Sequence, residues 1–239
     1  MKQYPKYKKD LTHSYCFGLY TTSELVNFAA QKIKHMFFAK EYEKSEQSKK
    51  LMDFCVSNNI ELTINTKKIN SLSGNKKILV GAAFNKNEQL LPNDQNHIVL
   101  VNPQNLGNLG TIIRSMMGFD YENLAIVGTS GDVWDPTCVT ASMGSIFSIK
   151  IKTYANFGSY LDEFKQRQLL SFALQTETLL DGVSFESPHS LIFGNEGSGL
   201  DESVISATTP IKIKQSNSID SLNLSTATSI AMYESYKSV

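Results

Sequence analysis

The chain has 239 residues, of which 41% are hydrophobic and 19% charged, enough for one large or two small globular domains. No apolar run approaches the ~20 residues of a membrane span, and no apolar stretch follows the basic N-terminus, so we expect neither a transmembrane helix nor a secretory signal. Cys16, Cys55 and Cys138 lack paired spacing, which argues against a zinc site or a disulfide framework and favours a reducing cytoplasm.

The formal net charge of zero hides two halves of opposite sign. Residues 1–97 hold 15 lysines and 9 acidic residues, a net charge of +6, and residues 98–239 carry the balancing −6. A basic part joined to an acidic part is typical of a nucleic-acid-binding module attached to a catalytic domain. A solvated lysine-rich surface gives the same imbalance, so charge alone leaves both interpretations open.

The first 95 residues predict a small α/β domain. Residues 1–15 are rich in Lys and Tyr and are expected to be loosely ordered. Apolar residues in 22–40 recur every three and four positions, which predicts an amphipathic helix, with a short strand at 35–39 sharing its end. A second helix and two further strands are expected at 45–58, 60–64 and 78–84.

Residues 90–97 (LPNDQNH with the preceding Leu) form the predicted linker, because Pro, Asn and Asp gather there without apolar periodicity. Beyond it, strand-like and helix-like segments alternate through a second domain at 96–239. This pattern favours a parallel sheet with helices on both faces. The expected strands are 98–101, 124–127, 146–151, 170–174, 191–193 and a short one at Ile211 and Ile213; the expected helices are 108–117, 138–143, 156–168 and 221–236.

Three short stretches in this second domain carry most of the chemistry. Residues 102–115, 191–200 and 221–227 each join Gly, Asn and small hydroxyl residues directly to an apolar run. Such loops let the backbone, rather than side chains, approach a ligand. Three of them in order predict one composite pocket.

The glycine-rich loop at 194–200 has two other interpretations. A dinucleotide site expects its Gly-rich turn after the first strand and an acid about 20 residues later, whereas this loop follows a late strand. A plain flexible turn is the second alternative.

These stretches resemble the three motifs of the SpoU (TrmH) family of RNA ribose 2′-O-methyltransferases, in the SPOUT superfamily, which use S-adenosylmethionine (AdoMet). The resemblance covers residues from about 98 to the C-terminus. The matching positions are Asn108, Gly110 and Arg114 in the first motif; Gly194, Glu196, Gly197, Gly199 and Leu200 in the second; and Ile213, Ser221, Leu222 and Asn223 in the third. Lys214 and Asn217 depart from the family pattern, so the rim of the cofactor loop is expected to differ in shape.

The resemblance implies a trefoil knot in the second domain, a ribosomal-protein-like substrate-binding domain before it, and a homodimer. It implies methyl transfer from AdoMet to an RNA ribose 2′-OH, with rRNA favoured over tRNA and no metal. The implied cofactor-binding residues are Gly194, Asn195, Gly197, Ile213, Leu222 and Asn223, and the implied catalytic residues are Arg114, Asn108, Glu196, Ser221 and Asn223. An RNA-binding protein that kept the fold but lost methylation, and a nucleotide-dependent oxidoreductase, remain as alternatives.

The residue types at some of these positions predict specific roles. Arg114 and Arg167 are the only arginines among 21 lysines, and a planar guanidinium can grip phosphate in a bidentate way that lysine cannot. Glu196 is expected to hold Arg114 or Asn108, and Ser221 either caps the last helix or contacts substrate. A β-branched residue at Gly197 is expected to block the loop.

Overall fold

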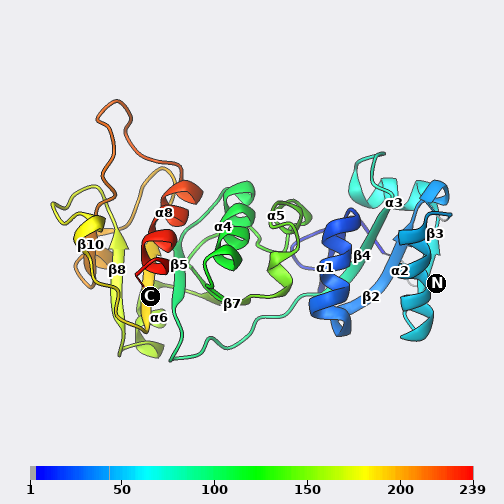
Figure 1. Ribbon diagram of the computed structural model, residues 1–239, viewed down its shortest axis with the longest axis horizontal. Coiled ribbons are helices and arrows are strands. Elements are labelled where there is room, and N and C mark those ends of the chain that lie inside the picture. The colour runs from blue at the N-terminus through cyan, green and yellow to red at the C-terminus, as the bar shows by residue number, and fades with distance from the viewer. Residues whose placement is uncertain (1–3, 43, 239) are drawn as a thin grey trace. The chain divides into compact units, whose positions relative to one another are not determined.

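The computed structural model describes residues 4–42 and 44–238, which divide into two compact units (Figure 1). The first unit contains the described part of residues 4–87 together with Asp132–Ser148. The second contains Glu88–Gly131 and the described residues from Ile149 onward. The predicted domains meet at a single boundary near residue 95. The two units are instead interleaved in sequence, because the segment 132–148, from the second half of the chain, belongs to the first unit.

The first unit is built on a mixed four-stranded sheet in the order β1-β4-β2-β3. Strand β4 pairs antiparallel with β1 and β2, whereas β2 and β3 are parallel. One face buries Tyr15 and Phe37 with Ile69, and on the other Phe84 meets Phe147 edge to face. The elements are β1 (His13–Phe17), α1 (Leu19–Ala29), β2 (Ile33–Phe38), α2 (Glu46–Ser57), β3 (Leu62–Ile64), α3 (Thr66–Ser73), β4 (Val80–Asn85) and α5 (Pro136–Ala141).

Two expectations for this unit are wrong. The helix predicted over 22–40 ends at Ala29, and residues 33–38 form β2, as the strand expected at 35–39 anticipated. The described part of 1–15 is not loose: Tyr4 is 6% exposed and Tyr15 is fully buried, because β1 begins at His13. Residues 1–3 lie outside the described residues.

The second unit has a six-stranded sheet in the order β10-β8-β9-β5-β6-β7, in which all neighbouring strands are parallel. The predicted parallel sheet flanked by helices is thereby confirmed. Its elements are β5 (His97–Val101), α4 (Leu106–Gly118), β6 (Asn123–Val127), β7 (Lys150–Tyr154), α6 (Phe157–Glu163), β8 (Gln168–Phe172), β9 (His189–Phe193), α7 (Glu202–Ile205), β10 (Thr209–Ile211) and α8 (Leu224–Tyr236).

Alternating side chains of the central strand β5 serve both faces of this sheet. Val99 and Val101 join a core cluster with Tyr160 and Phe164 from the α6 region. Ile98 and Leu100, which are fully buried, therefore point to the opposite face. Helices α4 and α8 pack against each other, and Figure 1 shows them side by side in front of β5.

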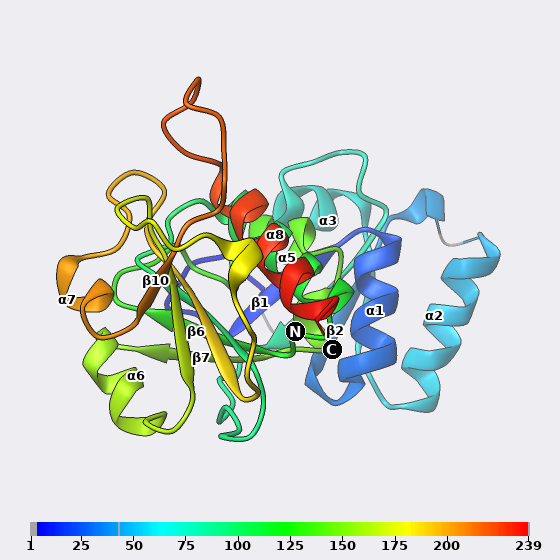
Figure 2. The same ribbon diagram turned by 60° about the vertical axis from the view of Figure 1, so that its left-hand side comes forward.

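Some boundaries predicted for the sequence beyond the linker shift. The strand expected at 146–151 is a 3-10 turn at Ser145–Phe147 followed by β7, and the helix expected at 156–168 ends at Glu163. The last helix begins at Leu224 rather than residue 221, and Ile213 lies beyond the end of β10. The segment between β10 and α8 stands out as a projecting loop in Figures 1 and 2.

The strand order fixes where a ligand site is expected. The chain runs from β5 outward through β6 and β7, and then crosses to the other side of β5 to form β8 and β9. The direction in which successive strands are added to the sheet therefore reverses between β5 and β9. In open parallel sheets, ligands bind outside the carboxyl ends of the strands at such a reversal.

Candidate functional site

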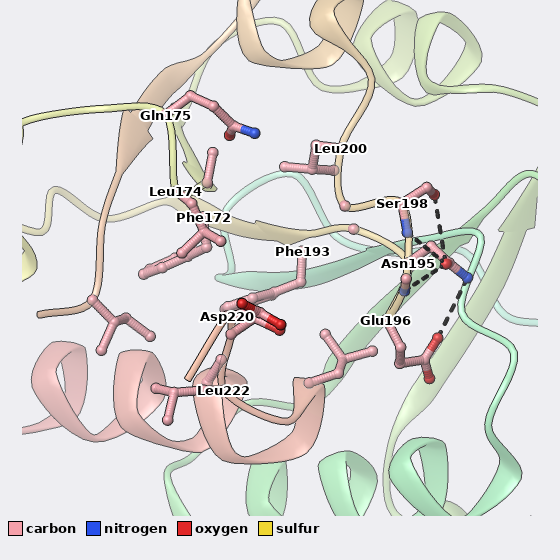
Figure 3. Close-up of a pocket in the computed structure, with 18 of the residues that line it drawn as sticks. Phe172, Leu174, Gln175, Phe193, Asn195, Glu196, Ser198, Leu200, Asp220 and Leu222 are labelled. Carbon is pink, nitrogen blue, oxygen red and sulfur yellow. Dashed lines mark hydrogen bonds between the residues drawn. The ribbon is translucent and has the colours of Figure 1, made fainter. Parts of the chain in front are cut away.

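A cavity of about 310 Å³ lies at the carboxyl ends of β8, β9 and β10 (Figure 3). Its walls combine the stacked pair Phe172 and Phe193 with backbone of the loop 194–200 and the segment leading into α8. Five of the six predicted cofactor residues line it: Gly194, Asn195, Gly197, Ile213 and Leu222. The sixth, Asn223, lines an adjoining depression together with Asn108, Glu196 and Ser221.

The loop 194–200 is held in shape by Asn195. Its side-chain oxygen accepts hydrogen bonds from the amides of Gly197 and Ser198 at 2.9 and 3.1 Å, and its backbone exchanges two 3.0 Å hydrogen bonds with Gly199 (Figure 3). This tight closure brings the backbone of Gly199 against Gly194: a Cβ added at 194 would lie 2.2 Å from the Gly199 carbonyl. Gly199 itself has a φ of +70°, which favours glycine.

The expectation that Gly197 is the constrained glycine is not supported by this geometry. Its φ is not positive, and the nearest atom to an added Cβ is the Asn195 side-chain oxygen at 3.5 Å, an ordinary contact. The steric demand for glycine falls on Gly194, three residues earlier, which the sequence motif does not distinguish.

Glu196 joins the glycine-rich loop to the start of α4. One carboxylate oxygen accepts hydrogen bonds from the Asn105 amide and the Asn108 side chain, both at 3.2 Å. The other accepts longer ones, at 3.4 Å, from the Gln104 amide and Asn195 Nδ2. The carboxylate thus satisfies amides at a helix N-terminus, where negative charge is favoured.

The pKa of Glu196 reflects these contacts. Partial burial acts to raise the pKa of the carboxyl, but the hydrogen bonds from its own amide, from Asn108 and from the amides of Asn105 and Gln104 outweigh burial and lower it. Glu196 is therefore a charged structural anchor at neutral pH.

Asn108 connects this anchor to the third sequence motif. While its amide nitrogen donates to Glu196, its side-chain oxygen accepts a 3.1 Å hydrogen bond from Asn223 Nδ2. Asn223 also caps α8, its side-chain oxygen accepting from the Ser225 amide at 2.9 Å. Glu196, Asn108 and Asn223, one residue from each of the three motifs, thus form one continuous chain of hydrogen bonds.

The structure contradicts one of the two roles expected for Ser221. The cap of the last helix is Asn223, so Ser221 does not cap it. Ser221 is exposed instead and lines both the cavity and the adjoining depression, where a ligand could meet its hydroxyl.

Arg114 is not brought to this cluster. It lies on an exposed position of α4 and lines neither the cavity nor the adjoining depression, and its side chain makes no hydrogen bond or ion pair with the described residues. Of the two partners expected for Glu196, the structure shows Asn108 and not Arg114.

Sequence reasoning missed Asn102, although it stands at the head of the first motif. It has a φ of +52°, its side chain accepts from the Thr129 amide at 2.9 Å, and its carbonyl accepts from Asn195 Nδ2 at 2.9 Å. It therefore ties the ends of β5, β6 and β9 together. An Asn directly after a buried strand was the available signal, since Asn tolerates this conformation better than most residues.

The described residues offer neither a metal site nor a membrane-spanning helix. Within 4–42 and 44–238, no three His, Cys, Asp or Glu side chains gather so that they could hold a metal ion. In the same residues, no helix has the length and apolar character to cross a membrane.

Comparison with known proteins agrees with the three motifs. Residues 95–233, more than half of the chain, match the SpoU rRNA Methylase family, and the chain belongs to that family. The chain is 30% identical to an uncharacterized tRNA/rRNA methyltransferase of Synechocystis sp. over 57% of this chain and 51% of the relative. It is 29% identical to the 23S rRNA (uridine(2479)-2′-O)-methyltransferase of Streptomyces viridochromogenes over 56% and 50%. The chain thus spans about half the length of these two relatives.

Solved structures share the fold over nearly the whole chain. The SpoU methyltransferase AviRb of Streptomyces viridochromogenes, in complex with AdoMet, superposes with a TM-score of 0.83 at 20% identity, covering 95% of this chain and 90% of that one. An AdoMet-bound rRNA methyltransferase of Sinorhizobium meliloti gives 0.83 at 23% identity, covering 95% and 87%.

Proposed function

We propose that this protein is an AdoMet-dependent RNA methyltransferase that modifies a ribose 2′-OH. The observation that carries the proposal is the hydrogen-bonded chain Glu196–Asn108–Asn223 at the edge of the cavity. If the loop 194–200 were only a flexible turn, hydrogen bonds between residues of three motifs far apart in the sequence would not be expected. Nor does a dinucleotide site explain it, because here the glycine-rich loop follows β9 rather than the first strand of its sheet.

The cavity fits the cofactor on several grounds. Its volume of about 310 Å³ lies in the range of small-molecule sites, and its aromatic and aliphatic walls suit an adenosine group. The close approach at Gly194 leaves backbone of the loop facing the ligand, and Ile213 and Leu222 contribute from the other side. When bound, AdoMet would supply the methyl group, with its sulfonium sulfur leaving as a neutral thioether.

The adjoining depression is the proposed place of the acceptor ribose. Ser221, Asn108 and Asn223 line it beside the cavity, and their side chains can donate and accept hydrogen bonds. We assign Asn108 and Asn223 to positioning the 2′-OH, Ser221 to a substrate contact, and Glu196 to holding Asn108. Since a guanidinium offers only hydrogen-bond donors, in a fork that fits phosphate, Arg114 is assigned to gripping an RNA phosphate rather than to removing the hydroxyl proton.

The substrate class follows from the chemistry and from the relatives. A 2′-OH distinguishes RNA from DNA. We take rRNA rather than tRNA as the substrate, since relatives from Streptomyces viridochromogenes and Bacillus subtilis are named for 23S rRNA, although one from Methanocaldococcus jannaschii is named for tRNA. The first unit, whose segments 1–87 and 132–148 together hold 15 lysines and 9 acidic residues, is proposed to bind the RNA as a ribosomal-protein-like module.

Three further features belong to the same proposal. The second unit is proposed to contain a trefoil knot, which its match to the SpoU family supports. It is proposed to form a homodimer through α4 and α8. A cytoplasmic location is supported by Cys16, Cys55 and Cys138, which are all buried free thiols.

Two experiments test the function. Incubating purified protein with methyl-labelled AdoMet and rRNA or tRNA should label rRNA, and ribose-methylation mapping of RNA from cells with and without the protein should locate the nucleotide. The alternative, an RNA-binding protein of the same fold without activity, predicts RNA binding with no AdoMet binding by calorimetry and no labelled product.

A further inference from the structure

Asp220 is an acidic side chain of the cavity, and its carboxylate has no partner among the described residues. Among the described residues that line the cavity, ionisable groups come only from Glu196 and Asp220. The Glu196 carboxylate is occupied by hydrogen bonds from residues 104, 105, 108 and 195. The Asp220 carboxylate, in contrast, makes no hydrogen bond or ion pair within the described residues, although its backbone is engaged.

The chain around Asp220 is fixed on both sides. Gln215 Nε2 donates a 3.2 Å hydrogen bond to the Asp220 carbonyl, which closes the neck of the projecting loop. Three residues later Asn223 caps α8. Figure 3 shows Asp220 at the cavity beside Leu222, near the first turns of α8. The carboxylate is therefore presented to the cavity by a constrained backbone.

The charge of the two cofactor forms differs at this site. AdoMet carries a sulfonium, an ammonium and a carboxylate, a net charge of +1. The demethylated product, S-adenosylhomocysteine, has a neutral thioether and a net charge of zero. No lysine, arginine or histidine lines the cavity among the described residues, so its ionisable groups favour a cationic ligand.

Resting on the proposed function, we propose that Asp220 is a specificity-determining residue that makes the cavity bind AdoMet more tightly than S-adenosylhomocysteine. The ribose and adenine are common to both molecules, so Asp220 acts on the charge that distinguishes them. Once the methyl group has left, the ligand has lost one positive charge and the attraction to Asp220 falls. Asp220 thereby favours release of the product.

The expected size of the effect follows from the exposure of Asp220. Its side chain is solvent-exposed at the cavity rim, so its attraction for a cation is screened by water. We expect Asp220→Asn to weaken AdoMet binding by roughly three- to tenfold and to leave S-adenosylhomocysteine within about twofold. The ratio of the two dissociation constants is therefore the decisive quantity.

Calorimetry on the full chain tests this with three probes: AdoMet, S-adenosylhomocysteine and sinefungin, whose amine carries a positive charge in place of the methylsulfonium. Asp201→Asn is the matched control. Asp201 is exposed and does not line the cavity, so this substitution removes the same charge away from the ligand. Only Asp220→Asn should weaken AdoMet and sinefungin, and the native preference should shrink as salt is raised from 0.05 to about 0.5 M.

The outcomes separate this inference from the proposed function. Equal weakening of AdoMet and S-adenosylhomocysteine by Asp220→Asn would assign Asp220 to the shared ribose and overturn the inference, as would no change in either. The same selective loss in Asp201→Asn would overturn it too, since the effect would come from overall charge. A native protein that binds none of the three probes would overturn both the inference and the proposed cofactor.

Discussion

At the scale of single residues, the two glycines of the loop 194–200 make different demands. A Cβ at Gly194 would lie 2.2 Å from backbone atoms of Gly199, which cannot move without breaking the paired hydrogen bonds of the loop. A Cβ at Gly197 would touch only a side-chain oxygen at 3.5 Å. The motif predicts that glycines gather here, but not which one is sterically required, because that depends on where the loop closes on itself.

The first prediction compares the two positions. Gly194→Ala should lower AdoMet affinity by more than about tenfold, since the loop must open to accommodate the methyl group, whereas Gly197→Ala should stay within about threefold. Calorimetry gives the affinities, and circular dichroism confirms that both variants are folded. Similar affinities for the two variants would contradict the assignment of the constraint to Gly194.

The two arginines of this lysine-rich chain illustrate what a guanidinium offers. Arg167 donates to Ser190 Oγ at 3.2 Å and to the carbonyls of Asn93 and Gln95 at 2.8 and 3.1 Å, a fork of contacts that lysine could not reproduce. Arg114 is exposed and has no such protein partners among the described residues. Its fork is therefore available for a ligand.

The second prediction concerns the exposed guanidinium of Arg114. Arg114→Lys keeps the charge and touches no internal contact, so folding and AdoMet affinity should remain unchanged while methyl transfer falls by about 10²-fold. Single-turnover rates on the native RNA, compared with Lys165→Gln as a surface control, measure this. Near-normal turnover would show that Arg114 does not grip the target nucleotide.

At the scale of helices and strands, short apolar runs limited what the sequence could predict. The residues around Phe28, Ile33 and Phe37 recur at helical spacing, yet His35–Phe38 are buried in succession, so both faces of the sheet are covered at β2. A run buried on both faces gives no period that separates strand from helix. Helix α3 was not predicted because it is short and polar, and buries only Ile69 and Leu72. The loops of the first two motifs were located, since Gly and Asn mark loop positions independently of burial, whereas residues 221–223 of the third were placed in the last helix.

The third prediction concerns the face shared by α4 and α8. Tyr233 and Tyr236 are about half exposed and meet Phe119, at 6.0 and 6.1 Å between ring centroids. Such an aromatic surface suits a second copy of the chain. The native protein should sediment as a dimer at micromolar concentration and Tyr233→Glu as a monomer. Tyr20→Glu, an equally exposed tyrosine of the first unit, should leave the dimer intact. A monomeric native protein with full activity would contradict the proposal.

The amino ends of the strands hold a buried polar chain, at the edge opposite the cavity. His97 Nε2 lies 2.9 Å from the Pro92 carbonyl, which can only accept, so Nδ1 accepts from Tyr160 Oη at 2.9 Å. Tyr160 in turn contacts Ser190 at 2.7 Å. The predicted linker is thus fastened to the second unit. Burial, and secondarily Arg167, lowers the pKa of His97 to about 3.

The fourth prediction is an acid sensitivity that begins above the usual carboxylate range. Burial, aided by Arg167, also lowers the pKa of His189, to about 4. Both folded pKa values lie below the unfolded value of ~6.5, so the unfolded chain binds more protons below that pH and stability falls as the pH drops from 6.5. Each histidine should lower the free energy of unfolding by about 1–2 kcal/mol at pH 5. As the pH is lowered from 6.5, the urea midpoint of His97→Gln should fall less steeply than that of the native protein. An identical slope would contradict the role of His97 in acid sensitivity.

At the scale of the whole molecule, the chain passes between the two units three times. It leaves the first unit after Asn87, returns for Asp132–Ser148, and leaves again. The returning segment buries Val139 and Ile146, and Ser14 donates to the Trp134 carbonyl. Sequence alone could not assign this segment, because it interrupts a regular alternation of strands and helices. Deleting residues 1–90 would therefore expose an apolar surface in what remains.

The fifth prediction tests RNA binding without such a deletion. If the basic unit neutralises phosphates, the double variant Lys8→Gln, Lys9→Gln should lose several-fold in RNA affinity at low salt, and the slope of log K against log salt should flatten by up to about 0.7 per lysine lost. Both lysines are exposed, so AdoMet affinity should not change. The matched control Lys165→Gln, Lys237→Gln removes two exposed lysines from the second unit. Equal losses of RNA affinity in the two double variants would show that the charge of the first unit does not set RNA binding.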